Sequence, residues 1–343
     1  MIGRQKSIVA GWRRCEKIFG GKKSRCFMHK LRINKLGPIE QCELNGSSFI
    51  TLTGFQASGK STIAKAIYYF RTVKDDIVEL ATRQALQQPL VPGLDEDVFD
   101  AGYGKDLKER LEIYLQEKLM STFGALQGMS DEMSLEYSFT EAYSIKVSLK
   151  SDKNYRKLND IWVTFSKDLT DFLQEKNNSL SLTPLGLSEE EMKLLKIEAY
   201  KLFDDDCAVV YIPAGRSMIT LLSQQFNYIY ARMDDMQKRS LDSCTRDYLE
   251  RILLIKPEFS DGIQGLTVRL SSQEAVPPQV VDQALNLIQA ILRGAYRYSN
   301  GEEQIVLNDG KYVKLNFASS GQQECVWILN LLFYYLLQRQ RIL

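Results

Sequence analysis

Histidine is nearly absent from this sequence, and its scarcity excludes several kinds of catalytic site. His29 is the only histidine among 343 residues. A mechanism that depends on a histidine base, or a metal site with several histidine ligands, is therefore not expected in this chain. Nucleases of the HNH and HD types are poor matches for the same reason.

Paired cysteines, long apolar runs and a strong net charge are missing as well. The six cysteines have no C-x-x-C spacing, which is typical of a reduced intracellular protein and not of a disulfide framework or a zinc site. The longest apolar run, residues 325–337, is interrupted by Asn330 and is too short to span a bilayer. No apolar segment follows the N-terminal charges, so we expect no signal peptide, a cytoplasmic location and no membrane partner.

Positive charge is concentrated at the start of the chain. The formal net charge is only +1, which argues against a surface that is basic throughout but leaves room for a local patch that binds nucleic acid. Residues 1–27 are rich in lysine and arginine, with Glu16 as their only acidic residue. They suit either a nucleic-acid-binding arm or a disordered leader upstream of a start at Met28. We favour the leader, because short charge runs are usually solvated tails.

The most informative stretch is residues 49–62, which we expect to form a strand, a glycine-bounded loop and a helix. Gly54 to Ser61 fits G-x-x-x-x-G-K-[ST], the phosphate-binding P-loop. Gly54 and Gly59 would let the backbone turn its N–H groups towards a phosphate, and the helix N-terminus favours an anion. Lys60 would act as the catalytic cation on the β- and γ-phosphates, and the Ser61 hydroxyl would ligate Mg²⁺.

The context of this loop supports a nucleotide site over a simple turn. Residues 31–46 alternate in polarity and contain two turn signals, which predicts a β-rich lead-in. Apolar residues then follow at helical spacing, namely Ile63, Ala66, Ile67 and Phe70. The residues that we expect to bind ATP here are Gly54, Phe55, Gln56, Ala57, Ser58, Gly59, Lys60, Ser61 and Thr62.

The rest of the chain alternates between predicted helices and short strands. Ser188 and Glu191 form a capping box that starts a helix. The predicted helical segments are 107–119, 168–203 with a break near Pro184, 218–255 and 280–292. Strand 143–149 is predicted to pair with strand 161–165, residues 208–212 to form a further strand, and residues 262–269 to form a short strand or turn. Residues 304–307 and 311–317 are predicted to form a hairpin, in which Val313, Leu315 and Phe317 point the same way.

Two polar features beside the predicted strand 208–212 are candidate sites. Asp204, Asp205 and Asp206 precede the strand, whereas ligands usually bind at the carboxyl ends of strands, so we favour a turn over a metal site. Arg216 follows the strand and lies at the end that suits function. It would either face a phosphate or a subunit interface, or hold the turn as a structural arginine.

A second helix start that suits an anion lies near the end of the chain. Residues 318–324 are small and polar, and an apolar helix follows them. Alone, this pattern is that of an ordinary capped helix. Together with the P-loop, it predicts the second half of a composite nucleotide site, formed by Ser319, Ser320, Gly321 and Gln322.

These motifs together resemble those of the ABC-type ATPases of the SMC/RecF/OLD group, often described as AAA-family ATP-binding proteins. Residues 31–39 are similar to the opening strand and "gPI" turn of that group, and residues 54–62 to its P-loop. Ser319, Gly321 and Gln322 match its signature motif, while Ser320 replaces the first glycine. The resemblance covers residues 28–343, and within the group it is closest to ATPase components of bacterial anti-phage systems of the Septu, retron-associated and PARIS types.

The resemblance implies an α/β fold, namely a P-loop ABC-type ATPase head with a β-rich N-terminal lobe and a helical insertion. The expected regions are the leader 1–27, a P-loop lobe 28–103, a mostly helical insertion with a β-hairpin 104–203, and a second lobe 204–343 that bears the signature. It also implies ATP and Mg²⁺ as ligands and head-to-tail dimers or larger oligomers, in which the signature of one copy reads ATP on another. A nuclease or toxin effector is the implied partner.

One element of the family pattern is missing. The family places a Walker B strand, four apolar residues and then Asp/Glu-Glu, soon after the signature helix, and none occurs before Leu343. We therefore expect either a chain that is truncated before Walker B or a protein that binds ATP without efficient hydrolysis. A Q-loop glutamine is not assigned, with Gln84, Gln87 and Gln88 as candidates by position. The alternatives to a defence ATPase are a RecF/SMC-like DNA-repair ATPase and a nucleotide-locked scaffold that does not hydrolyse ATP.

Overall fold

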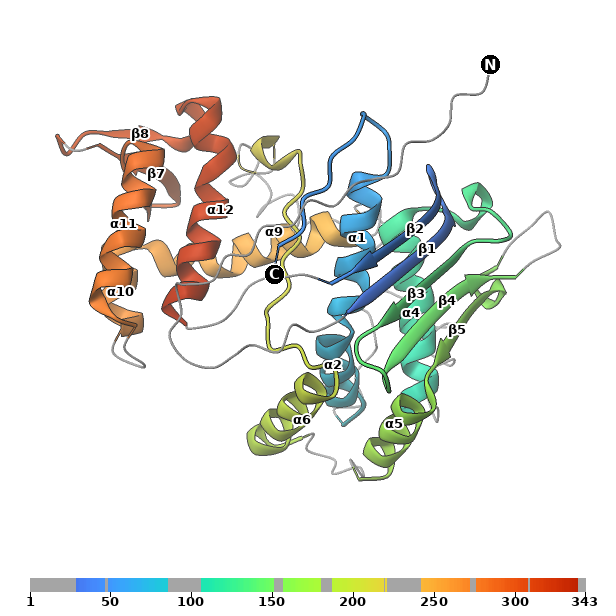
Figure 1. Cartoon of the computed structure of the whole chain (residues 1–343). Coiled ribbons are helices and arrows are strands. Elements are labelled where there is room, and N and C mark those ends of the chain that lie inside the picture. Colours follow the sequence, from blue (N-terminus) through green and yellow to red (C-terminus); the bar gives the residue numbers. More distant parts are fainter. Residues whose placement is uncertain are drawn as a thin grey trace, which may run out of the picture. The chain divides into compact units, whose positions relative to one another are not determined.

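The computed structural model of the protein describes residues 29–46, 49–85, 106–150, 157–179, 187–218, 220, 242–271, 276–307 and 309–338. The chain divides into two compact units, Met1–Asp205 and Asp206–Leu343. Each unit combines helices with an antiparallel sheet (Figure 1). The predicted mixed α/β class is therefore confirmed, and residues 1–27 lie outside the described part of the chain.

The first unit contains a five-stranded antiparallel sheet in the order β2-β1-β3-β4-β5. Its strands are β1 (Lys30–Leu36), β2 (Ile39–Asn45), β3 (Ser134–Ser138), β4 (Ser144–Leu149) and β5 (Ile161–Phe165). Alternate residues such as Leu31, Leu135 and Ile145 are buried on one face, while the residues between them are polar, as expected for a sheet with one face in the core. The lead-in strands thus belong to the same sheet as residues 134–165.

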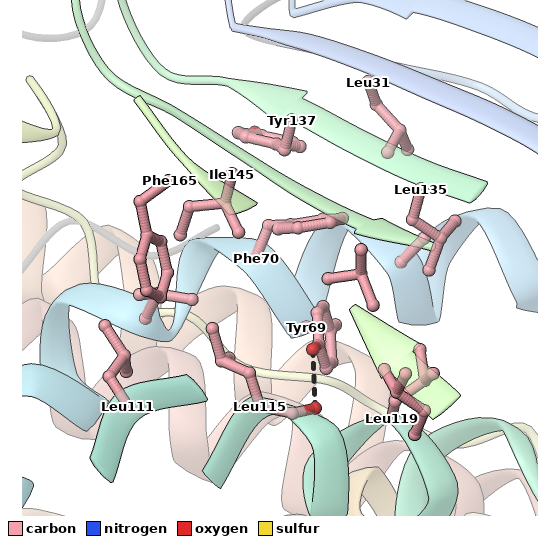
Figure 2. Close-up of a cluster of buried hydrophobic side chains, with 14 of the residues drawn as sticks. Leu31, Tyr69, Phe70, Leu111, Leu115, Leu119, Leu135, Tyr137, Ile145 and Phe165 are labelled. Atoms are coloured by element: carbon pink, nitrogen blue, oxygen red, sulfur yellow. Dashed lines mark hydrogen bonds between the residues drawn. The ribbon is translucent and has the colours of Figure 1, made fainter. Parts of the chain in front are cut away.

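Helices cover the apolar face of this sheet. They are α1 (Lys60–Arg71), α2 (Val73–Ala85), α4 (Leu107–Phe123), α5 (Lys167–Ser179) and α6 (Glu189–Leu202), with short 3₁₀ turns η1 (Leu126–Gly128) and η2 (Leu158–Asp160). Figure 2 shows Phe70 of α1 directed at Tyr137 and Ile145 of the sheet, while Tyr69 is directed at α4. The Tyr69 hydroxyl donates a 2.7 Å hydrogen bond to the Leu115 carbonyl. The helix that follows the glycine loop is therefore fixed on two sides by the core.

The second unit is mostly helical, with a three-stranded antiparallel sheet in the order β6-β7-β8. Its helical elements are α9 (Ser243–Ile255), η3 (Lys256–Phe259), α10 (Gly262–Ser271), α11 (Pro278–Leu292), η4 (Leu315–Phe317) and α12 (Ser320–Leu337). The strands are β6 (Ala295–Ser299), β7 (Glu302–Val306) and β8 (Tyr312–Lys314).

A buried ion pair lies in the core of the second unit. Lys256 Nζ is 2.7 Å from a carboxylate oxygen of Glu303, and both side chains are almost fully buried. The other carboxylate oxygen accepts hydrogen bonds from the Tyr296 hydroxyl at 3.0 Å and from Trp327 Nε1 at 3.1 Å. Because each buried charge has partners, the pair can lie among the aromatic side chains of this core.

Several sequence predictions are confirmed. The helices at 107–119 and 280–292 form as α4 and α11, the hairpin of 143–149 with 161–165 forms as β4 and β5, and residues 304–307 and 311–314 pair as β7 and β8. Ser188 and Glu191 make the expected capping box at the start of α6. The predicted helix break near Pro184, residues 219 and 221–241 of the predicted helix 218–255, and Gln87 and Gln88 lie outside the described residues, while residues 243–255 form α9.

Two predicted strands are wrong. A strand requires a neighbour for its backbone hydrogen bonds, and residues 49–53 pair with no strand in the described part of the chain, where Phe49 is 70% exposed. In residues 208–212 only Ala208 forms a single bridge. The Val209 carbonyl instead accepts a 3.2 Å hydrogen bond from the Arg251 guanidinium. In a strand, this carbonyl would accept from the backbone of a neighbouring strand.

Two further corrections concern the second unit. Residues 262–269 form helix α10 instead of a short strand or turn, because Ile263 and Leu266 are buried at helical spacing. Strand β8 ends at Lys314, and the 3₁₀ turn η4 that follows breaks the alternation of the hairpin. Leu315 is therefore buried while Phe317 is 77% exposed, so these side chains do not point the same way.

Candidate functional site

The loop that precedes α1 is tightly folded. Gly54, Ala57 and Gly59 have positive φ angles of 157°, 59° and 93°. Glycine adopts such angles readily, whereas an alanine there costs about 1–2 kcal/mol. Strained residues cluster at functional sites, so the conformation of Ala57 points to a loop shaped for a ligand.

Gly59 is required by the packing under the loop. A Cβ atom at this position would lie 2.6 Å from Ile39 Cγ1 and 3.4 Å from Pro38 Cγ. Ile39 is buried at the start of β2, so it cannot move away freely. The turn between β1 and β2 thus packs against the glycine loop.

The Lys60 side chain folds back across the loop. Its Nζ donates to the carbonyl oxygens of Gly54 at 2.8 Å and Phe55 at 2.5 Å, and lies 3.4 Å from the Ser58 hydroxyl. All three acceptors are neutral, and no carboxylate of the described residues pairs with this ammonium group. Its positive charge is therefore available to an anion that enters the loop.

The N-terminus of α1 adds further donors. Its N-cap residue is Gly59, which has no capping side chain, and its first turn contains no acidic residue. Among the described residues, no acceptor bonds the backbone N–H groups of Lys60, Ser61 and Thr62. These N–H groups and the helix dipole favour a negative charge.

Mg²⁺ would have few protein ligands at this loop. Ser61 is exposed, and its hydroxyl has no partner in the part of the chain that the structure describes. No cluster of three or more His, Cys, Asp or Glu side chains is found among these residues. A serine hydroxyl fits a magnesium ion that takes its other ligands from water and from the phosphates of a nucleotide.

The signature residues of the second unit lie at the start of α12. Ser319 is the N-cap, and its hydroxyl accepts a 3.4 Å hydrogen bond from the Gln322 N–H. The Gln322 side-chain oxygen accepts a 3.0 Å hydrogen bond from the Ser319 N–H, and its amide nitrogen donates to the Leu292 carbonyl at 2.7 Å. The side chains of Ser319 and Gln322 are therefore engaged within the unit.

Ser320 and Gly321 are exposed in the first turn of this helix. A Cβ atom added to Gly321 would meet nothing within 4 Å. Glycine in a helix costs about 0.5–1 kcal/mol relative to alanine. Since nothing inside the unit requires a glycine here, its presence suits a close approach from outside the unit.

Sequence reasoning missed Gln323, the neighbour of the signature glutamine. Its side-chain amide donates to the carbonyl oxygens of Leu315, Asn316 and Ala318 at 3.1, 3.3 and 3.1 Å. Gln323 therefore fixes the turn that enters α12. A second glutamine directly after a capping box was the only signal for this role.

Arg216 contacts the turn that it follows and the first turns of α12. Its guanidinium lies 3.0 Å from a Glu324 carboxylate oxygen and donates to the backbone carbonyl of Glu324 at 3.0 Å. It also reaches the Pro213 carbonyl at 3.5 Å. Arg216 thus ties the turn of residues 213–216 to the first turns of α12.

The three aspartates at 204–206 form a turn and hold an ion pair, as expected for a structural segment. Asp204 has a φ of 51° after α6. The Asp205 carboxylate is buried, 2.6 Å from the Arg71 guanidinium and 3.0 Å from Lys74 Nζ. These two cations hold the pKa of Asp205 below its ordinary value despite burial, which alone would raise it.

The structure therefore gathers the predicted residues into two groups. Lys60 is brought together with Gly54, Phe55 and Ser58 in the first unit, and Ser319 with Gln322 in the second. No protein-family model and no curated protein matches this chain. The residues of the two groups are consequently the basis for assigning a function.

Proposed function

We propose that this protein is an ABC-type ATP-binding protein of the SMC/RecF/OLD kind. It would bind ATP and Mg²⁺ at the loop of residues 54–61 and assemble by nucleotide-dependent head-to-tail dimerisation. The observation that carries the proposal is the arrangement of Lys60 beside an uncapped helix N-terminus, where its ammonium contacts neutral acceptors and no carboxylate of the described residues. A tight loop of this kind combines a mobile positive charge with oriented N–H donors, which suits a chain of phosphates.

The loop residues would act by exchanging partners. Lys60 would leave the carbonyl oxygens of Gly54 and Phe55 and donate to phosphate oxygens, since a bond between two charged groups is stronger than one to a neutral carbonyl. The N–H groups of Ser61 and Thr62 would donate to the same phosphates. Bound Mg²⁺ would neutralise part of the phosphate charge, with the Ser61 hydroxyl as its protein ligand.

The start of α12 would recognise ATP bound to a second copy. Ser320 and Gly321 are exposed, and the space around Gly321 admits a close approach. ATP would then stabilise the dimer, because it contacts both copies only in the assembled state. The anti-phage role and the nuclease or toxin effector rest on the family resemblance alone.

A complementation experiment tests the head-to-tail arrangement. Lys60→Ala disables the loop and Ser319→Arg blocks the signature, so neither variant should dimerise with ATP. In an equimolar mixture, a mixed dimer has one site with both defects and one intact site. Mass photometry with a slowly hydrolysed ATP analogue should therefore detect dimers of wild type and of the mixture, but not of either variant alone. A mixture that stays monomeric, beside a wild type that dimerises, would exclude a signature that acts in trans.

Turnover by the same samples separates an ATPase from a scaffold. ATP hydrolysis by wild type that Lys60→Ala abolishes indicates an enzyme. ATP-dependent dimers without turnover indicate a nucleotide-locked scaffold. Binding of DNA that ATP strengthens and salt weakens would favour the RecF/SMC-like alternative over a defence role.

A further inference from the structure

In the described part of the chain, the buried lysines have carboxylate partners and the buried arginine does not. Four cationic side chains, apart from the single histidine, are buried in the described part of the chain. Three of them form ion pairs, namely Lys74–Asp205 at 3.0 Å, Lys256–Glu303 at 2.7 Å and Lys118–Asp76. The fourth, Arg110 in the first turn of α4, is only 6% exposed and has no ion-pair or hydrogen-bond partner among the described residues. Among the described residues of the first unit, Arg110 is thus the buried cation that lacks a counter-charge.

An unpaired guanidinium is costly at such a position. Arg110 Nε is buried without an acceptor. Arginine stays protonated in proteins, so it cannot avoid the cost by losing its proton. Burial lowers the pKa of Arg110, and no carboxylate lies close enough to raise it. Arginine is almost never buried in proteins unless it is paired, so Arg110 calls for an anion.

Two polar side chains near the start of α4, those of its N-cap residue and of Asn177 in α5, are engaged with backbone N–H groups of α4. The Asp106 carboxylate caps the helix by accepting from the Glu109 N–H at 2.8 Å. The Asn177 side-chain oxygen accepts from the Leu107 N–H at 3.0 Å. The donors of the Arg110 guanidinium therefore remain open for a group from outside the unit.

We propose that Arg110 is the recognition residue of a small-oxyanion site, separate from the glycine loop, that takes a phosphate-sized ligand. The planar fork of a guanidinium donates two parallel hydrogen bonds to such a group. Because only 6% of Arg110 is exposed, a compact anion can reach it and an extended surface cannot. This site does not depend on ATP binding at residues 54–61.

Phosphate-dependent thermal stability tests the site. The experiment uses full-length protein carrying Lys60→Ala, which weakens phosphate binding at the glycine loop. Inorganic phosphate is titrated against sodium chloride at matched ionic strength. Phosphate should raise the unfolding midpoint of this protein in a concentration-dependent manner. Adding Arg110→Met should abolish that increment and raise the phosphate-free midpoint by about 2–4 °C, since it removes an unpaired buried charge.

Two further variants make the result specific. Arg110→Lys keeps the charge but loses the fork, so it should retain only part of the phosphate increment. Arg32→Met removes a half-exposed arginine that pairs with Glu43 and should leave the increment unchanged. An equal phosphate increment with and without Arg110→Met, or no increment in the Lys60→Ala protein, would overturn the proposal. Neither result decides whether the wild-type protein binds ATP at residues 54–61, because that site is tested separately with wild type.

Discussion

At the start of α12, one substitution is expected to stabilise the fold and to weaken ATP-dependent dimerisation. Gly321→Ala adds one methyl group at an exposed helical position, where nothing lies within 4 Å of the new atom. Replacing glycine by alanine in a helix stabilises the fold by about 0.5–1 kcal/mol, and a first-turn position should give the lower part of that range. Folding alone therefore predicts a small gain in stability.

Assembly predicts a loss from the same substitution. In a head-to-tail dimer, the methyl group would occupy the space that the nucleotide of the second copy approaches. We expect ATP-dependent dimerisation to weaken at least about 10-fold, which corresponds to about 1.4 kcal/mol. Urea unfolding measures the first effect, and the concentration dependence of the dimer in mass photometry measures the second.

A matched control and two contrary outcomes make this test decisive. Gly128→Ala adds a methyl group to an open position of the first unit and should leave dimerisation unchanged. Wild-type dimerisation by Gly321→Ala would refute the idea that a nucleotide approaches the start of α12. A loss of stability above about 1 kcal/mol would instead refute the open space that the structure shows there.

Three further predictions concern the loop, the second core and the single histidine. Gly59→Ala should destabilise the first unit by about 2–5 kcal/mol in urea unfolding, because residue 59 has a positive φ and the new methyl group would overlap with Ile39. Gly37→Ala, at a φ of 56° but in open space, should cost only about 1–2 kcal/mol. Equal costs for the two substitutions would contradict the packing of Gly59 against Ile39. Lys256→Met should lower the free energy of unfolding by about 3–5 kcal/mol in urea unfolding, because it leaves the buried Glu303 carboxylate without its cation. Adding Glu303→Gln should recover part of that loss. A double variant that is less stable than the single one would contradict the pairing. Burial, and then the charge of Arg71, lowers the pKa of His29 from 6.5 to about 4, so the stability that depends on neutral His29 is present above about pH 6.5 and is lost as the pH falls towards 4. The NMR signal of this single histidine should titrate with a midpoint near pH 4. A midpoint near 6.5 would contradict its burial.

The features that the sequence predicts correctly are local ones. The helix that follows the glycine loop and the capping box of Ser188 with Glu191 follow from residues within a few positions of each other. Helix α4 follows from its apolar spacing. Such patterns need no knowledge of the rest of the chain, because the helix bonds within itself.

The features that the sequence does not predict depend on distant partners. Residues 49–53 have the composition of a strand, but pairing depends on a neighbour that the described residues do not supply. The pairing of Arg71 with Asp205 joins residues 134 positions apart, and that of Arg216 with Glu324 joins residues 108 positions apart. A sequence pattern gives no signal for such contacts, so the partners of Arg216 could not be predicted from the sequence.

The measurement that tests the central claim most directly is ATP affinity, determined by calorimetry with Mg²⁺ for wild type and Lys60→Ala. Bonds to charged groups contribute about 1.5–3 kcal/mol, so Lys60→Ala should weaken ATP binding by about 10- to 150-fold. Lys146→Ala, at an exposed position of β4, should bind like wild type. Wild-type affinity in the Lys60→Ala protein, or no ATP binding by wild type, would contradict a nucleotide site at residues 54–61.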